Sequence, residues 1–219
     1  MIYDFHTHTL MSDGVLSAVE LIRRAEVAGY AAIGITDHTG AGTLEVVINA
    51  AIQDCELIRQ HWKIKAIPGV ELTHIPPESI AELAAKAKAL GAKLVIVHGQ
   101  TIVEPVPPGT NMAALQCTQV DILAHPGLLT AEEAALAAKN NIYLELSARQ
   151  GHSLSNGLVA KIAAAAGAKL LVNSDAHTPS DILSEAHQRS VAQSAGLNDA
   201  DIEKALHVNP AALMEKILR

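Results

Sequence analysis

Short apolar segments alternate with helix-forming segments along almost the whole 219-residue chain, and this alternation limits the possible folds. The predicted strands cover residues 2–5, 31–38, 64–72, 93–98, 120–127, 142–147 and 169–177. The predicted helices lie between Ser17 and Gly29, over 44–60, over 79–90, from Met112, after a Thr130–Glu133 capping box, and over 155–166. Strict alternation of this kind implies parallel strands that are joined by helical crossovers. The fold class is therefore α/β.

The ends of the predicted strands decide between an open sheet and a closed barrel. Nearly every strand ends in His, Asp or Glu, and no glycine-rich phosphate fingerprint opens a helix. Catalytic groups at the C-terminal ends of many strands are typical of barrels. We therefore expect a single domain over 1–219, a distorted (β/α)7 TIM-like barrel. Residues 180–219 should form a C-terminal tail of two or three helices with a break at Asn209-Pro210. Pro68, inside a strand, predicts a bend or bulge.

Nine residues at or just after these strand ends are candidate metal ligands. His6 and His8 are two residues apart, so an extended strand would point both rings to one side. Divalent metals bind imidazoles and carboxylates that converge from different elements. The nine candidates are His6, His8, Asp13, His38, Glu71, His98, His125, Asp175 and His177. Asp13 is the weakest of them, and each one taken alone could be an ordinary capping or core residue.

Composition excludes several classes of protein. The net charge of −7 does not suit binding to long nucleic acid. We see no signal peptide and no apolar run that approaches the roughly 20 residues of a membrane span, so we expect a cytoplasmic protein without membrane contact. Cys55 and Cys117 are far apart and outside any CxxC pattern, which predicts free thiols. Oligomeric state stays open.

The ordered motifs HTH…D, TDH, GVE, VH, AHPG and SDAH, between Asp4 and Pro179, resemble the polymerase and histidinol phosphatase (PHP) family. The resemblance implies a (β/α)7 barrel and a centre of three divalent ions, Zn, Mn or Fe. It places His6, His8, Glu71 and Asp175 on the first ion. It places Glu71, as a bridge, with His98 and His125 on the second. It places Asp13, His38 and His177 on the third.

Two further aspartates are candidates to orient the predicted ligands. Asp4 and Asp37 directly precede motif histidines, and ligating imidazoles usually donate their other N–H to an acceptor. Asp4 would orient His6, and Asp37 would orient His38. An ordinary hydrogen bond at a strand end is the alternative for each.

The resemblance also implies an activity, the hydrolysis of a small phosphomonoester by a metal-activated hydroxide. Glu71, Asp175 and Arg149 are the predicted catalytic residues. Arg149 follows a predicted strand, and its guanidinium could grip phosphate bidentately. His152 and His74 are further candidates for substrate binding. Loop 99–111 could cover the mouth or be a plain connector.

Other functions stay possible at this point. A nucleotide or an oligonucleotide 5′ end could be the substrate in place of a histidinol-phosphate-like molecule. An amidohydrolase-type enzyme also begins with HxH, but that family has a bridging lysine where this chain has His98. A non-catalytic metal-binding PHP module is the third alternative.

Overall fold

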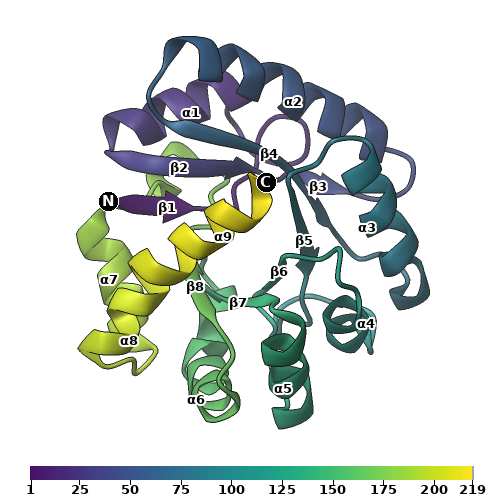
Figure 1. The fold of residues 1–219 in the computed structure, drawn as a ribbon, viewed down its shortest axis with the longest axis vertical. Coiled ribbons are helices and arrows are strands. Elements are labelled where there is room, and N and C mark those ends of the chain that lie inside the picture. Colours follow the sequence, from purple (N-terminus) through teal and green to yellow (C-terminus); the bar gives the residue numbers. More distant parts are fainter. Residues whose placement is uncertain (219) are drawn as a thin grey trace.

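The computed structural model describes residues 1–218, in which parallel strands curl into a nearly closed barrel with helices outside it (Figure 1). The strands are β1 (Ile2–Asp4), β2 (Tyr30–Ile35), β3 (His38–Thr39), β4 (Lys65–Leu72), β5 (Leu94–His98), β6 (Ile122–Ala124), β7 (Tyr143–Ser147) and β8 (Leu170–Asn173). Their order around the barrel is β1-β2-β4-β5-β6-β7-β8, and the two-residue β3 pairs with the end of β4. The predicted seven-stranded α/β barrel is confirmed for this part of the chain.

Helices follow the strands, and all but the last of them cover the outside of the barrel. They are α1 (Ala18–Val27), α2 (Leu44–His61), α3 (Ile80–Ala89), α4 (Thr110–Gln116), α5 (Ala131–Asn140), α6 (Asn156–Ala166), α7 (Glu185–Ser194), α8 (Asp199–Glu203) and α9 (Asn209–Ile217). The predicted capping box of α5 is present, because Thr130 accepts from the Glu133 N–H while Glu133 accepts from the Thr130 N–H. Among residues 1–218, no helix is long and apolar enough to cross a membrane. Both cysteines are free and buried.

The barrel interior follows a two-residue period. Ile67 on β4 and Leu94 and Ile96 on β5 lie in the inner apolar cluster, together with residues of α9. Because successive inward positions are two apart, the same period brings Glu71 and His98 to the inner face at the strand ends. The strands thus begin in an apolar core and finish in a polar site.

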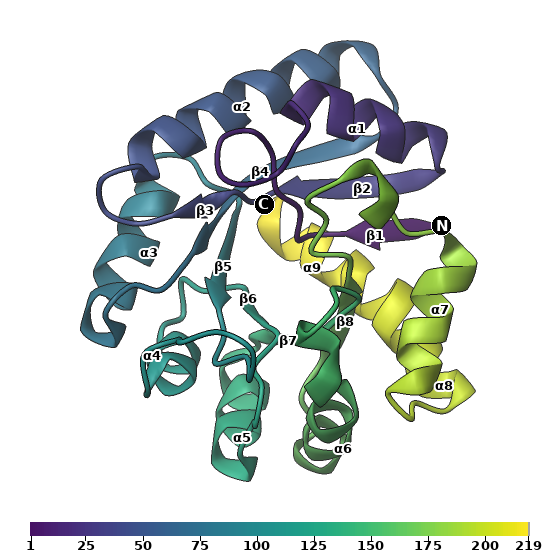
Figure 2. The ribbon, with the colours of Figure 1, turned by 180° about the vertical axis from the view of Figure 1, so that it is seen from behind.

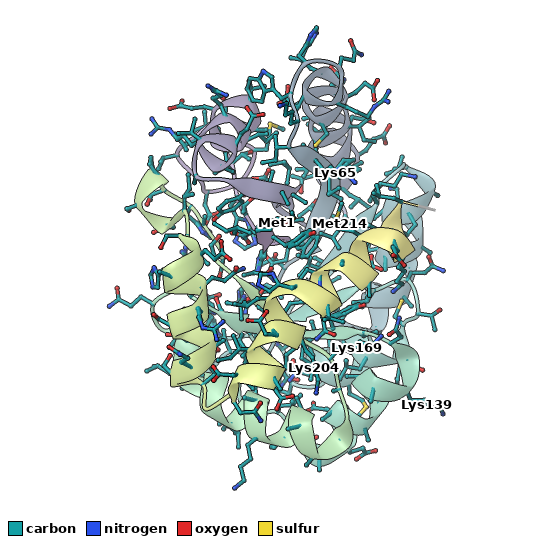
Figure 3. All side chains as sticks on the ribbon, turned by 60° about the vertical axis from the view of Figure 1, so that its left-hand side comes forward. Met1, Lys65, Lys139, Lys169, Lys204 and Met214 are labelled. Carbon is teal, nitrogen blue, oxygen red and sulfur yellow. The ribbon has the colours of Figure 1, made fainter. Side chains whose placement is uncertain are left out.

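α9 lies across the end of the barrel where the strands begin. Leu213, Met214 and Ile217 of this helix are buried in the inner apolar cluster. Figure 3 shows α9 in front of the barrel, with Met214 near Lys65 at the start of β4. The loops that follow the strands lie at the opposite end, which Figure 2 turns toward the viewer.

The barrel closes between β1 and β8 mostly through side chains. Thr7 and Ala176 form an isolated bridge beyond the two strands. The Gln188 side-chain amide of α7 donates to the carbonyls of Tyr3 and Val172, at 2.8 and 2.9 Å. One buried glutamine therefore joins the first strand to the last.

Several predicted boundaries are wrong. α4 begins at Thr110, two residues before the predicted Met112. The predicted strands 120–127 and 169–177 shorten to β6 and β8, because the backbone turns to positive φ at His125 (26°) and Asp175 (55°). Extended strands cannot contain such residues.

Pro68 lies in a central strand without shifting its register. It pairs with Ile35 of β2 in the same register that later joins His38 to Glu71. β5 begins one position further along, where Leu94 pairs with Gly69. The N–H that proline lacks therefore falls before the β5 ladder starts, and no bulge forms there.

The predicted break at Asn209-Pro210 is also wrong. The chain stays helical from α8 through a π-helical segment, Lys204–Val208, into α9. Pro210 is the second residue of α9, directly after the π-helical segment, which interrupts the regular α-helical ladder next to the place where proline lacks an N–H.

Candidate metal centre

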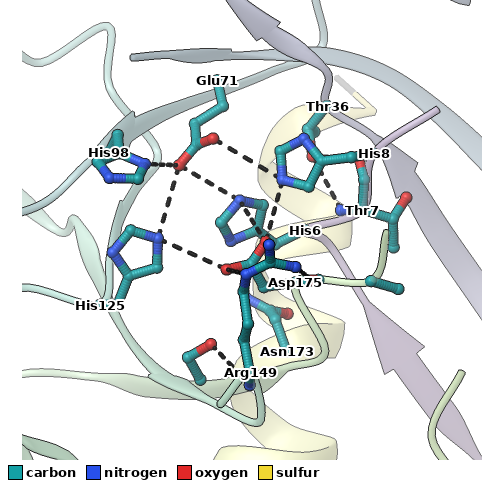
Figure 4. Close-up of polar contacts among 12 residues, drawn as sticks. His6, Thr7, His8, Thr36, Glu71, His98, His125, Arg149, Asn173 and Asp175 are labelled. Atoms are coloured by element: carbon teal, nitrogen blue, oxygen red, sulfur yellow. Dashed lines mark hydrogen bonds and ion pairs between the residues drawn. The ribbon is translucent and has the colours of Figure 1, made fainter. Parts of the chain in front are cut away.

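Glu71 is fully buried, and Figure 4 shows its contacts with His6, His8, His98 and His125. Its Oε1 is 3.3 Å from His6 Nε2, 3.2 Å from His98 Nδ1 and 3.8 Å from His125 Nε2. Its other oxygen faces His38 Nδ1. One carboxylate thus joins histidines that come from four different segments of the chain.

Asp175 is the second buried carboxylate of the cluster. Its Oδ1 is 3.1 Å from His8 Nε2, and its Oδ2 is 3.7 Å from His125 Nε2. Burial raises the pKa of Asp175 to about 8, although the nearby His6 opposes this. A carboxyl in this setting gains from a cation that would stabilise its ionised form.

Asp13 reaches the cluster from the loop after β1, and its side chain is 55% exposed. Its Oδ1 is 3.1 Å from His177 Nε2 and 3.5 Å from His38 Nε2. The structure therefore brings all nine predicted ligands into one continuous group of contacts.

The donor atoms have the spacing that divalent ions require. Two ligands bound about 2.0–2.1 Å from one tetrahedral ion stand about 3.3–3.4 Å apart. Five contacts to Glu71, Asp175 and Asp13 measure 3.1 to 3.5 Å, and the contact of His38 Nδ1 with Glu71 Oε2 is shorter. The buried atoms that have no hydrogen-bond partner among residues 1–218 include the Nε2 atoms of His6, His8, His125 and His177 and Oδ1 of Asp175. These residues fit divalent metal ions, because unpaired buried polar atoms are otherwise costly.

Glu145, on β7, is a functional candidate that sequence reasoning missed. It is fully buried, and its Oε2 lies 2.8 Å from His6 Nδ1. Asn173 donates a hydrogen bond of 2.9 Å to the same oxygen. Glu145 therefore fixes the orientation of His6, whose Nε2 faces Glu71 and Asp175. The available signal was a glutamate inside the apolar strand YLELS.

The predicted orienting roles of Asp4 and Asp37 are wrong. Asp4 accepts from the backbone N–H groups of His6 and Ser174, at 3.3 and 3.1 Å, rather than from an imidazole ring. Asp37 accepts from the Thr9 N–H and hydroxyl and from the Ser12 hydroxyl, at 2.6 to 2.7 Å. Asp4 therefore fixes the backbone at the strand ends, and Asp37 fixes the loop that follows β1. These are ordinary hydrogen bonds at strand ends, the alternative that the sequence left open.

Arg149 lies on the rim beside two predicted ligands. Its guanidinium donates to the backbone carbonyl of Asp175 at 3.3 Å and contacts the His177 ring. It borders a cavity of about 250 Å³ over the cluster and a second cavity of about 530 Å³. Asp175 and His177 line both cavities as well. A cation thus stands where the two spaces meet.

Glu104, in loop 99–111, is the second residue that sequence reasoning missed. Its carboxylate oxygens lie 3.0 Å from His74 Nε2, 3.0 Å from His98 Nε2 and 3.2 Å from His152 Nε2. Its interaction with His98 is the largest cause that lowers the pKa of Glu104, to about 2. The predicted substrate contacts His74 and His152 therefore both face a carboxylate. Nothing in the sequence marked this one acidic residue of the loop.

The family model named PHP domain matches residues 4–207. The chain belongs to this family, whose members are metal-dependent phosphoesterases. The match extends beyond Pro179, where the recognised motifs end.

The chain is also similar to individual proteins of other organisms. The chain is 44% identical to an uncharacterized protein of Methanocaldococcus jannaschii, over 99% of this chain and 100% of that protein. It is 28% identical to a protein of Thermoanaerobacter named "Probable phosphatase", over 91% of this chain and 88% of that protein. A shorter match, 35% identical over 32% of this chain and 23% of the relative, is to a 5'-3' exoribonuclease of Haemophilus influenzae.

A solved structure shares the fold. A chain in the cryo-EM structure of archaeal ribonuclease P with mature tRNA superposes with a TM-score of 0.70 at 14% identity. The similarity covers 97% of this chain and 89% of that chain. At this identity the likeness shows the architecture alone.

Proposed function

We propose that this protein hydrolyses a small phosphomonoester at a centre of three divalent ions of Zn, Mn or Fe. His6, His8, Glu71 and Asp175 would hold the first ion. Glu71, His98 and His125 would hold the second. Asp13, His38 and His177 would hold the third. Bound ions would lower the pKa of water and neutralise the charge of the phosphate.

The observation that carries this proposal is the position of Arg149 at the junction of the two cavities. A guanidinium can bind two phosphate oxygens in a fixed plane. Arg149 would thus hold the phosphate against the buried cluster, and its contacts with Asp175 and His177 keep its head at that place. Glu71 and Asp175 supply the buried negative charge that binds cations there.

The 530 Å³ cavity supports a second candidate substrate, a nucleotide or the 5′ end of a short oligonucleotide. Gln150, Thr178, Ser180 and His187 line this space and can hydrogen-bond a polar leaving group. The volume of this cavity is larger than a phosphate group alone would occupy. The partial match to a 5'-3' exoribonuclease supports the same candidate.

The test is a comparison of Arg149→Ala with wild type in the metal-loaded enzyme. We expect kcat/KM for a phosphomonoester to fall about 10²-fold, the scale of a lost bidentate charged contact, with unchanged metal content. Arg59→Ala is the matched control, because Arg59 pairs with Glu56 on the exposed face of α2. Loss of metal from Arg149→Ala would contradict the proposed role.

The choice of substrates separates the remaining alternatives. Release of phosphate from small esters supports the first candidate, and preference for 5′-phosphorylated oligonucleotides supports the second. Hydrolysis of amides or lactones without phosphatase activity would indicate amidohydrolase chemistry. Tight metal binding without turnover of any ester would indicate a non-catalytic module.

A further inference from the structure

His74, Glu104 and His152 form a cluster at the mouth of the barrel, outside the nine predicted ligands. The two carboxylate oxygens of Glu104 point to different histidines, Oε2 to His74 Nε2 at 3.0 Å and Oε1 to His152 Nε2 at 3.2 Å. These separations are close to the roughly 3.3 Å between neighbouring ligands of a tetrahedral zinc ion. Two imidazoles and one carboxylate, with a side open to the cavity, are a ligand set used by zinc and by ferrous iron.

We propose that His74, Glu104 and His152 bind an additional divalent metal ion, separate from the ions held around Glu71. The proposal goes beyond the phosphoesterase activity and does not depend on it.

The position of His98 separates the two sites. Its Nδ1 faces Glu71 at 3.2 Å, and its Nε2 faces Glu104 at 3.0 Å. Nδ1 can therefore serve the inner centre, while Nε2 contacts the carboxylate of the outer site and has no hydrogen-bond partner among the described residues. This arrangement leaves His74 and His152 free to ligate the outer ion.

The loop holds Glu104 in place before any ion binds. At its base the Gln100 N–H donates to Asn111 Oδ1, and the Asn111 N–H donates to Gln100 Oε1, at 2.9 and 3.0 Å. Next to Glu104, the side chain of Val103 lies so close to Gly151 that a Cβ there would meet it at 3.3 Å. The reciprocal hydrogen bonds between Gln100 and Asn111, together with the packing of Val103, give Glu104 a defined position next to His152.

The backbone supports the same assignment at the two histidines. His74 adopts φ 53°, a left-handed conformation that is uncommon for non-glycine residues. His152 is 3% exposed, and its Nδ1 is buried without a hydrogen-bond partner among the described residues. The ring of His152 is therefore enclosed, whereas His74 reaches the site from an exposed position.

The experiment counts zinc ions in the full-length protein after metal removal and titration with Zn²⁺ against a chromophoric chelator. We expect Glu104→Gln, His74→Ala and His152→Ala each to bind one equivalent per chain less than wild type. Cobalt substitution should show the same loss as a fall in visible absorption. Glu215→Gln, an exposed carboxylate of α9 at the far end of the barrel, and His61→Ala, at the end of α2, are matched controls that should keep the wild-type count.

Three outcomes would overturn the proposal. All three variants could bind as many ions as wild type. Only Glu104→Gln could lose an ion, which would mean that Glu104 acts through His98 on the inner centre. Wild type could fill the additional site only at millimolar Zn²⁺. Because the readout is binding, an absence of phosphatase activity would refute the proposed function without touching this site.

Discussion

The two ends of the barrel are built from the same strands, but one end is apolar and the other is polar. Where the strands begin, Ile67 and Leu94 pack with Leu213 of α9, and this end is apolar. Where they finish, Glu71 and His98 occupy inward positions four residues further along the same strands, and this end is polar. The apolar end supplies the free energy of folding that allows the polar end to keep buried atoms without partners. Stability and chemistry are thus separated along each strand.

The largest effect should come from Glu71→Gln at the polar end. Removing the carboxylate that faces five histidines should lower phosphoesterase activity by at least about 10³-fold, beyond the usual loss of one stabilising group in an active site. Metal content, measured by emission spectroscopy, should fall with activity. Far-ultraviolet circular dichroism should match wild type, because the apolar end is untouched. Retained activity would remove Glu71 from the centre of the site.

Leu213→Ala tests the other end. Leu213 is fully buried, so the substitution should lower the free energy of unfolding by about 2–5 kcal/mol. Urea denaturation measures this loss. The kcat of the folded variant should stay near wild type, and a large fall in kcat would show that the two ends are coupled. Ala211→Gly, on a more exposed position of α9, controls for helix propensity alone.

Glu145→Gln addresses the support of the metal centre. Loss of the carboxylate that orients His6 should weaken metal affinity about 10–100-fold, the range found for partners of ligating histidines. A competition titration with a chelator measures the change. Glu133→Gln serves as a comparison, because Glu133 caps α5 away from the centre. Unchanged affinity in Glu145→Gln would mean that packing alone orients His6.

Gln188→Ala tests the side chain that joins β1 to β8. Two backbone carbonyls would lose their donor, which should cost about 1–2 kcal/mol of unfolding free energy. The effect should be smaller than that of Leu213→Ala, since the substitution removes less apolar surface from the core. Hydrogen exchange should rise first in β1 and β8. Equal protection of all strands from hydrogen exchange would show that the contact between β1 and β8 opens only with global unfolding.

Much of the metal centre could be predicted from the sequence because its residues have a simple place in the strand pattern. Glu71 and His98 end apolar segments, and the ordered motifs identified the family. Glu145 escaped notice because a glutamate inside a strand has no motif around it. Glu104 escaped notice because its partners His74 and His152 are distant in the sequence and meet only through the path of the loop.

The alternation of apolar and helical segments by itself determined the barrel, since parallel strands joined by helices have few compact arrangements. The polar strand ends likewise determined which end carries the site. The tertiary structure decided where two of the strands stop, because the backbone turns to positive φ at His125 and Asp175, a conformation that the apolar pattern of the strands does not predict. It also decided which carboxylate orients which histidine. Such contacts depend on rings and oxygens from distant segments meeting at about 3 Å, a distance that no local pattern encodes.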